Sequence, residues 1–128
     1  MRFDIGINIL IGKTVTDIKK NDNTLLFTCS DGTKYKMHHD QDCCEDVYID
    51  DICGDLNDLI GSEIIKAEES TNTNLSPMNF GTEALKHYDE SHTWTFYHIA
   101  TINGYVTIRW FGSSNGYYSE SVNFDEIK

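Results

Sequence analysis

Apolar and polar residues alternate along three short stretches in the first half of the chain. The stretches at residues 13–20, 24–30 and 33–38 are rich in β-branched and aromatic side chains. A period of two is typical of strands that bury one face. The dipeptide Asp31-Gly32, between the second and third stretches, favours a two-residue hairpin turn. The pattern therefore predicts a three-stranded antiparallel meander.

The second half of the chain repeats this design. Stretches with strand-like alternation at residues 93–101, 105–112 and 117–124 are separated by Asn103-Gly104 and Asn115-Gly116. Both dipeptides favour tight turns, because asparagine and glycine adopt positive φ at low cost. We therefore expect a second meander near the C-terminal end.

One short motif occurs twice and indicates junctions between a helix and a strand. The sequence reads LIGKTV at residues 10–15 and LIGSEI at residues 59–64. In each copy, apolar residues at helical spacing end at a glycine, which commonly terminates a helix. The motif predicts short amphipathic helices before Gly12 and Gly61, with Asp50-Asp51 as the cap of the second helix. The alternative is a chance repeat of a common helix stop.

The length of 128 residues fits a single domain. The predicted fold class is α+β, with two antiparallel β-meanders and two short helices. A first helix and meander cover residues 1–50, a second helix and strand cover 51–70, a loop covers 71–92, and the C-terminal meander covers 93–124. A weak helical pattern lies within this long loop at residues 83–88, and loops of such length are commonly functional.

Charge excludes several classes of partner. The chain has 10 Lys and Arg against 21 Asp and Glu, a formal net charge of −11. This field repels polyanions, so we expect neither duplex nucleic acid nor an anionic membrane as a partner. No apolar run approaches the roughly 20 residues of a membrane span. Because no secretion signal is evident, we expect a cytoplasmic protein whose four cysteines are reduced.

The densest group of potential metal ligands lies at residues 38–46, with the sequence HHDQDCCED. Structural zinc sites use ligands about two to four residues apart that come from two segments, whereas these ligands are adjacent. We therefore expect a turn in which Cys43 or Cys44 packs inward and the carboxylates face water. A bound metal is the less favoured alternative.

The sequence contains no motif that supports catalysis. It has no Gly-x-Ser-x-Gly elbow, no Walker-type phosphate loop and no Gly-x-Gly-x-x-Gly fingerprint. Helix capping explains Asp50-Asp51, and a solvated strand end explains Glu68-Glu69. We therefore expect no enzymatic activity and no cofactor.

The hairpin at Asn103-Gly104 predicts a candidate ligand-binding face. A two-residue turn pairs Ile102 with Tyr105, His98 with Arg109 and Phe96 with Phe111. One face then carries rings, a guanidinium and an imidazole, from Trp94, Phe96, His98, Tyr105, Arg109 and Phe111. The opposite face is apolar and consists of Tyr97, Ile99, Val106, Ile108 and Trp110. The first face suits a nucleotide-type ligand, because rings stack on bases and guanidinium groups bind phosphates.

A purely structural explanation fits the same residues. In this explanation the rings pack beneath the helices, and Arg109 pairs with one of the abundant acids, for example Glu120 on the next strand. The pattern alone favours neither explanation.

Several segments of the chain resemble a family of small proteins found in phages and in prophages of Firmicutes. The resemblance covers roughly residues 13–124, and its Cys-Cys and Ser-Asn-Gly-Tyr-Tyr segments are distinctive. The matching segments are residues 39–45, 52–56, 94–97, 104–110 and 114–120. This family is similar to the Thoeris anti-defence sponge proteins, which sequester the cyclic ADP-ribose signal of a bacterial TIR enzyme and, in some members, cyclic oligonucleotides.

The resemblance implies a homo-oligomeric phage protein that binds a cyclic nucleotide in the host cytoplasm without cleaving it. Arg109 and the residues near Asn79 and Phe80 are the positions where we first expect ligand contacts. A protein of another class also fits the acidic composition: an interaction module or nucleic-acid mimic that blocks a basic host partner. A metal-dependent hydrolase built on residues 38–46 is the third hypothesis.

Overall fold

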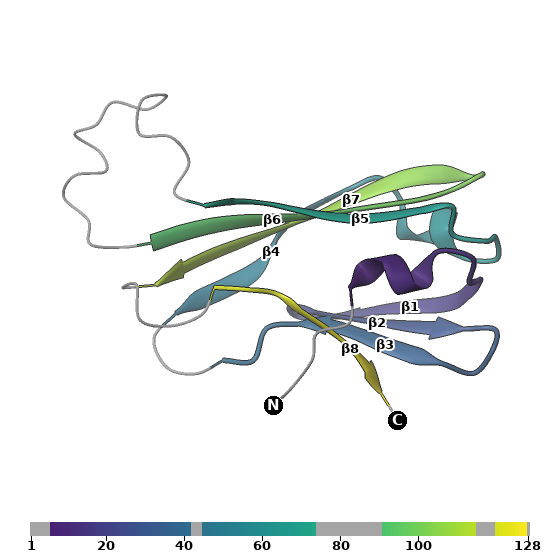
Figure 1. Ribbon diagram of the computed structural model, residues 1–128, viewed down its shortest axis with the longest axis horizontal. Helices are drawn as coiled ribbons and strands as arrows, with labels where there is room; N and C mark the ends of the chain where they lie inside the picture. Colours follow the sequence, from purple (N-terminus) through teal and green to yellow (C-terminus); the bar gives the residue numbers. More distant parts are fainter. Residues whose placement is uncertain (1–5, 42–44, 74–90, 115–119, 128) are drawn as a thin grey trace.

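Buried and more exposed side chains alternate along the strands, as expected for sheets with one face in a core. The structure is a computed structural model, and it describes residues 6–41, 45–73, 91–114 and 120–127. Within these residues the chain forms two four-stranded antiparallel sheets that lie one above the other (Figure 1). The fold is therefore a β-sandwich.

Sheet 1 contains the first three strands and the last one. β1 (Val15–Asn21), β2 (Thr24–Cys29) and β3 (Lys34–His38) follow one another as a meander. β8 (Asn123–Ile127) is added beside β3, which gives the order β1-β2-β3-β8.

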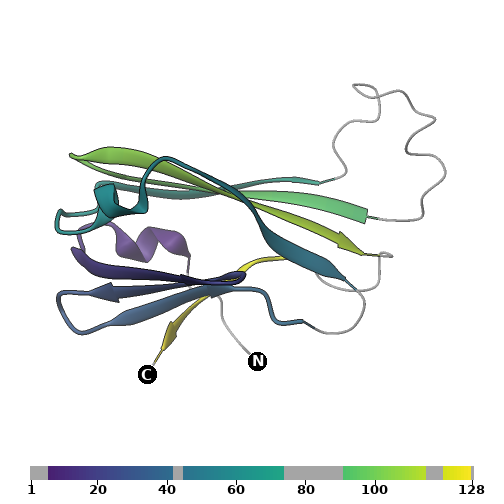
Figure 2. The ribbon, with the colours of Figure 1, turned by 180° about the vertical axis from the view of Figure 1, so that it is seen from behind.

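Sheet 2 contains the remaining strands in the order β4-β7-β6-β5. β5 (Lys66–Thr73), β6 (Ser91–Thr101) and β7 (Gly104–Ser114) form a second meander. β4 (Asp46–Cys53) is added beside β7, and Figure 2 shows it running from the end of β3 into the layer of β5, β6 and β7. Each meander is thus followed by a strand that joins the other sheet.

The α+β prediction is wrong, because the described residues form no α-helix and the fold is all-β. The predicted helices are single 3-10 turns, η1 (Ile7–Leu10) and η2 (Leu56–Leu59). Ile52 of the predicted second helix lies in β4, and Gly54 follows that strand at φ 108°. The segment between Gly54 and Gly61 is too short for a stable α-helix. In the part of the chain that the structure describes, no helix is long and apolar enough to cross a membrane.

The predicted cap of the second helix also has another role. Asp55 is the residue that caps η2, since its carboxylate accepts the backbone N–H of Asn57 at 2.9 Å. Asp50 and Asp51 lie in β4, where an irregularity between Ile49 and Asp51 shifts the pairing with β7. Such a bulge re-aims side chains, and it places these two carboxylates on sheet 2 beside β7.

The prediction of a last strand at residues 117–124 within the second meander is wrong. β8 begins at Asn123 and pairs with β3 of sheet 1. Ring packing favours this position, because Phe124 lies 5.4 Å from Tyr35 and 5.9 Å from Phe27 between ring centroids. The predicted turn at Asn115-Gly116 lies outside the described residues.

β6 and β7 form the predicted hairpin in a different register. Thr101 is opposite Gly104. Phe96, rather than His98, is therefore opposite Arg109. The predicted pairing slips by two residues, and the period of two keeps every side chain on its predicted face.

Contacts with η2 explain this register. The Thr101 hydroxyl accepts the backbone N–H of Asn103 at 3.1 Å and donates to the carbonyl oxygen of Asp58 at 2.5 Å. Gly104 packs directly on Asp58, whose Oδ2 would lie 2.6 Å from a Cβ atom at this position. The turn residues are consequently Ile102 and Asn103, one position earlier than predicted.

The core lies between the two sheets. Trp110 of β7 donates its indole N–H to the sulfur of Met37 on β3 at 3.3 Å, which joins the layers at the centre. The inward residues of the β6–β7 hairpin are those predicted for its apolar face, and this part of the prediction is confirmed: Tyr97, Ile99, Val106, Ile108 and Trp110 are all buried. The other face of sheet 2 therefore points away from the core.

The two copies of the Leu-Ile-Gly motif meet through reciprocal hydrogen bonds. Gly12 donates its backbone N–H to the carbonyl of Ile64 at 2.9 Å, and Gly61 donates to the carbonyl of Val15 at 2.8 Å. Both glycines have positive φ, 88° and 89°. Each motif is followed by a meander and then by a strand in the opposite sheet. The repeat is therefore structural, since each copy begins the same order of elements in its half of the chain.

Candidate functional site

A layer of aromatic side chains covers the outer face of sheet 2, and we call it the aromatic face. Its members are Tyr48 on β4, His92, Trp94, Phe96 and His98 on β6, and Tyr105, Arg109 and Phe111 on β7. Tyr48 is 38% exposed and Tyr105 is 50% exposed, and the others are half-buried. None of the described helices or strands lies over this face in Figure 1.

Sequence alternation predicts most of the aromatic face. His92 extends it by one position beyond the predicted strand. Tyr48 is missing from the prediction, because it lies between the turn expected at residues 38–46 and the helix expected after Asp50-Asp51. Val47 and Ile49, which flank Tyr48 and point inward, are the signal that identifies it as an outward residue of a strand.

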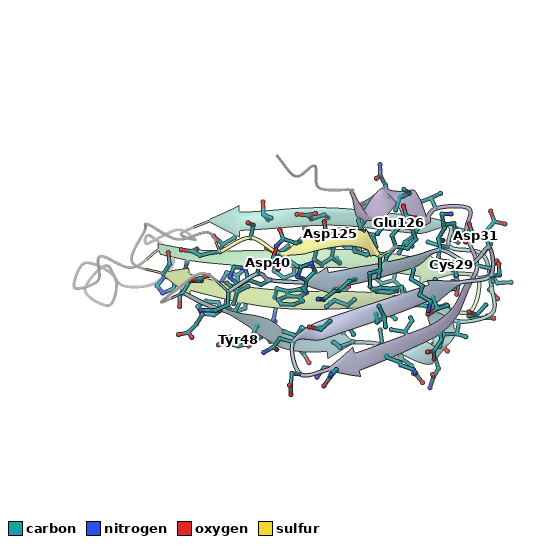
Figure 3. The ribbon with its side chains drawn as sticks, turned by 90° about the horizontal axis from the view of Figure 1, so that it is seen from below. Cys29, Asp31, Asp40, Tyr48, Asp125 and Glu126 are labelled. Carbon is teal, nitrogen blue, oxygen red and sulfur yellow. The ribbon has the colours of Figure 1, made fainter. Side chains whose placement is uncertain are left out.

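Phe111 is the centre of a ring cluster at one end of the aromatic face. Its ring centroid lies 4.7 Å from that of Trp94, 5.6 Å from that of His92 and 5.7 Å from that of Tyr48. These separations are typical of favourable aromatic pairs. Tyr48 projects at the margin of the molecule in Figure 3. Rings from three adjacent strands are thus held against one another before any ligand arrives.

Arg109 is bonded within the chain. Its Nε donates to Oδ2 of Asp50 at 2.7 Å, and its Nη2 lies 2.5 Å from the same oxygen. The guanidinium carbon lies 5.4 Å from the ring centroid of Trp94. Arg109 therefore pairs with an acid, as the structural explanation expects, although the acid is Asp50 and not Glu120. The positive charge on the aromatic face is largely compensated.

Glu120 has a different role, which sequence reasoning missed. It is only 8% exposed, and it accepts hydrogen bonds from the hydroxyls of Thr93 at 2.7 Å and of Ser114 at 2.6 Å. These bonds join the start of β6, the end of β7 and the segment that leads to β8. No local pattern distinguishes this glutamate from the many exposed acids.

His98 is the centre of the other end of the aromatic face. Its ring is nearly parallel to that of Phe96, with an interplanar angle of 8° and a centroid distance of 6.3 Å. The ring of Tyr105 lies 6.2 Å away. Nδ1 of His98 is 3.3 Å from the Thr107 hydroxyl, and Nε2 is 3.4 Å from the Ser70 hydroxyl. Neighbours on β5 and β7 thus fix the orientation of the imidazole.

Exposed carboxylates border the aromatic face: Asp46, Asp50, Asp51 and Glu68. The cations of this face are Arg109, bonded to Asp50, and Lys66, whose Nζ lies 3.8 Å from Glu68. Among the described residues, Asp46 and Asp51 have no cationic partner. The face is therefore aromatic and acidic.

Within the two sheets and the described segments that connect their strands, the acidic residues are concentrated in the layer of sheet 2. Residues 45–73 and 91–114, which include this sheet, contain nine Asp and Glu against two Lys and Arg. Residues 13–38 and 123–127, which include sheet 1, contain five of each. The segments that carry the aromatic face therefore have a net negative charge, whereas the charges of the sheet 1 segments balance.

His38, from the segment considered for metal binding, contacts two carboxylates within the chain. Its Nδ1 is 3.1 Å from Asp40, and its Nε2 is 2.8 Å from Asp125. Figure 3 labels both of these residues, Asp40 and Asp125, which lie near each other in that view. Among the described residues no group of three or more His, Cys, Asp or Glu is arranged to hold a metal ion. Residues 42–44, with the two adjacent cysteines, lie outside the described residues.

His39 forms a buried pair with Glu45. Its Nε2 lies 2.7 Å from Glu45 Oε2, and the two side chains are 5% and 0% exposed. Its Nδ1 lies 2.8 Å from the carbonyl oxygen of Ser121. The pair joins the β3–β4 connection to the segment before β8, which indicates a structural role for the two residues.

The loop residues implied by the resemblance, Asn79 and Phe80, lie outside the described residues, as does the predicted helix at 83–88. Their part in a site stays a prediction.

Cys53 lies on the outer face of sheet 2 and is exposed. Its thiol donates to Oδ2 of Asp51 at 3.3 Å. This hydrogen bond and the negative charge of Asp51 raise the pKa of the thiol, while the charge of Arg109 acts in the opposite direction. The thiolate is therefore disfavoured, which makes Cys53 a weak nucleophile near neutral pH.

Comparison with known proteins places this arrangement in a family. No curated protein matches the chain, and no solved structure matches it. A family model described as a domain of unknown function, DUF7448, matches residues 8–124. This range includes both Leu-Ile-Gly motifs, both meanders and all members of the aromatic face. The chain therefore belongs to the DUF7448 family.

Proposed function

We propose that this chain is a non-catalytic binding protein and that the aromatic face is its recognition surface. The observation that carries the proposal is the composition of the outer face of sheet 2. The outward residues of a β-sandwich are ordinarily polar, whereas rings gather here on a face that the core does not use. Contiguous exposed apolar surface marks interaction sites, and rings held in place provide contact area at a low entropic cost.

The charges around the aromatic face favour a basic partner. The surrounding layer is strongly acidic, Arg109 is already bonded to Asp50, and Asp46 and Asp51 stand without a cation among the described residues. Aromatic faces attract cations, and a negative field accelerates the approach of a positive partner. The function that this geometry supports best is sequestration of a basic protein segment.

A cyclic nucleotide signal is the second candidate ligand. The guanidinium of Arg109, 5.4 Å from the Trp94 ring, favours it, because such groups stack on bases. Base stacking contributes about 1–3 kcal/mol per base. The carboxylate of Asp50 opposes a phosphate at the same guanidinium, so stacking would have to provide most of the affinity. In this case the chain is a homo-oligomeric cytoplasmic sponge for a cyclic ADP-ribose isomer or a cyclic oligonucleotide.

Tryptophan fluorescence separates the two candidates, because the chain has only two tryptophans. Trp94 belongs to the aromatic face, and Trp110 is buried in the core. The full chain is titrated with a peptide rich in lysine and arginine and, separately, with cyclic ADP-ribose isomers and cyclic di- and trinucleotides. We expect the basic peptide to change the emission of Trp94, with an affinity that falls steeply as salt is added. Trp94→Phe removes this signal.

Two variants locate the binding surface. Phe111→Leu is expected to lower the affinity for the basic peptide. Ile127→Ala, which shortens an exposed apolar residue of sheet 1, is expected to leave that affinity unchanged. Binding of a nucleotide but not of the peptide, with little salt dependence, selects the sponge. If calorimetry detects neither ligand, the aromatic face is not a recognition surface for either of them.

A further inference from the structure

We infer that the ring cluster around Phe111 binds the guanidinium group of an arginine in the basic partner. This inference rests on the proposed function and names the side chain that the aromatic face selects. The residues concerned are Asp46 and Tyr48 on β4, Trp94 on β6 and Phe111 on β7.

The strand register brings a carboxylate to this ring cluster. Tyr48 is opposite Phe111, and Asp46 is opposite Ser113. Asp46 and Tyr48 are two positions apart on one strand, so their side chains leave the same face of sheet 2. Asp46 is exposed and has no cationic partner among the described residues. The cluster thus combines adjacent ring faces with an uncompensated carboxylate at its margin.

Arg109 demonstrates that this type of surface holds a guanidinium. Within the chain, Arg109 is bound by one carboxylate, Asp50, and one ring, Trp94. The Phe111 end offers the same two chemical elements, with Asp46 as the carboxylate and Tyr48 and Phe111 as rings 5.7 Å apart. A guanidinium from a partner would therefore meet an environment like the one that already binds Arg109.

Arginine fits these elements better than lysine does. A guanidinium is planar and weakly hydrated, and it can stack on a ring while its edge donates to a carboxylate. A lysine ammonium also approaches a ring on this face, since Nζ of Lys66 lies 5.3 Å from the ring centroid of Tyr105. It is compact and strongly hydrated, however, and has no planar edge that donates to a carboxylate while its face stacks on a ring. A second copy of this chain is a poor occupant, since two molecules with a charge of −11 repel each other.

Matched peptides test the selectivity on the full chain. Short glycine–serine peptides carry arginine, lysine or uncharged citrulline at the same positions, and each is titrated at low salt with Trp94 emission as the readout. We expect the arginine peptide to bind about fivefold or more tightly than the lysine peptide. The citrulline peptide should not bind measurably, because it keeps the planar group but loses the charge.

Three variants place the site. Asp46→Asn is nearly isosteric and exposed, so it is expected to fold and to reduce both the affinity for the arginine peptide and the preference over lysine. Phe111→Leu should have the same effect. Asp17→Asn removes one carboxylate from the outer face of sheet 1 and serves as the matched control, with the preference retained. Near-ultraviolet circular dichroism verifies that each variant is folded.

The outcomes separate this inference from the proposed function. Equal affinity for arginine and lysine peptides overturns the inference that the site selects arginine, but it leaves the proposal of a basic partner intact. If Asp46→Asn keeps the preference for arginine, the guanidinium binds somewhere other than the Phe111 cluster, and the assignment of the site is overturned. Absence of binding by either charged peptide removes the proposed function itself.

Discussion

Arg109 uses two nitrogens to contact a single carboxylate oxygen of Asp50, with Nε at 2.7 Å and Nη2 at 2.5 Å. The side chains are 40% and 28% exposed, so water screens the pair and limits its contribution to stability. Its main consequence concerns ligands, because the bond neutralises a carboxylate that a basic partner would otherwise meet.

Replacement of Arg109 by alanine is expected to separate the two candidate ligands. The free energy of unfolding should fall by about 1 kcal/mol or less, as for other exposed ion pairs. The carboxylate of Asp50 then has no bond to Arg109, so the affinity for a basic peptide should stay the same or rise. Binding of a nucleotide should be lost, because the guanidinium is absent. Urea denaturation and calorimetry measure both effects. If a folded Arg109→Ala protein no longer bound the basic peptide, the result would contradict the proposal that the partner is basic.

His39→Leu is expected to be strongly destabilising. The substitution leaves Glu45 buried without its imidazole partner, and breaking a buried pair in this way costs roughly 3–5 kcal/mol. The midpoint of urea unfolding provides the measurement. Lys13→Met, which breaks an exposed pair with Asp31, is the control and should change the midpoint much less. Equal effects of the two substitutions would show that the His39–Glu45 pair contributes no more to stability than an exposed pair does.

Asp31 is expected to make a small contribution to stability that is lost at acidic pH. Its hydrogen bonds with Lys13 and with Thr33 hold the pKa of this carboxyl well below its usual range. A lowered pKa stabilises the folded chain above the ordinary value of about 3.9, and the contribution disappears as the pH falls through the folded pKa. Melting temperatures of wild type and Asp31→Asn should therefore differ at neutral pH and converge at strongly acidic pH. A constant difference across this range would rule out the linkage.

Asp51→Asn is expected to make Cys53 more reactive. The carboxylate that raises the pKa of this thiol is removed, so the thiolate fraction near neutral pH increases. Alkylation by iodoacetamide, followed by mass spectrometry of the peptide that contains Cys53, should be several times faster. Asp55→Asn changes a nearby carboxylate that caps η2 and should leave the rate unchanged. An unaltered rate in Asp51→Asn would mean that the hydrogen bond does not control the thiol.

Local alternation was sufficient to place most of the β6 and β7 residues of the aromatic face. Tyr97, Ile99 and Ile108 are inward residues of long strands with an uninterrupted period of two, so the residues between them had to point outward. The faces survived an incorrect register because a slip by two residues preserves the alternation. Register itself depends on the packing of Gly104 on Asp58, a contact that local pattern does not reveal.

The identity of β4 was hidden by its bulge. The inward residues Val47 and Ile49 follow a period of two, but the shift before Asp51 breaks this period. Ile52 then falls by coincidence at helical spacing with Leu56 and Leu59. The predicted second helix, the missed Tyr48 and the missed pairing of Asp50 with Arg109 all follow from this one interruption.

The reciprocal bonds of Gly12 and Gly61, with the exchange of β4 and β8 between the sheets, have a consequence for folding. Neither half of the chain completes a sheet by itself, because β3 pairs with β8 and β4 pairs with β7, and each pair joins the two halves. These pairings close long loops before their contacts repay the lost entropy, which is typical of domains that fold in milliseconds to seconds. A chain cut between the motifs leaves two fragments with open strand edges, and such edges invite aggregation. The interlocked halves thus make the domain a single cooperative unit, in which the aromatic face is assembled only when the whole chain has folded.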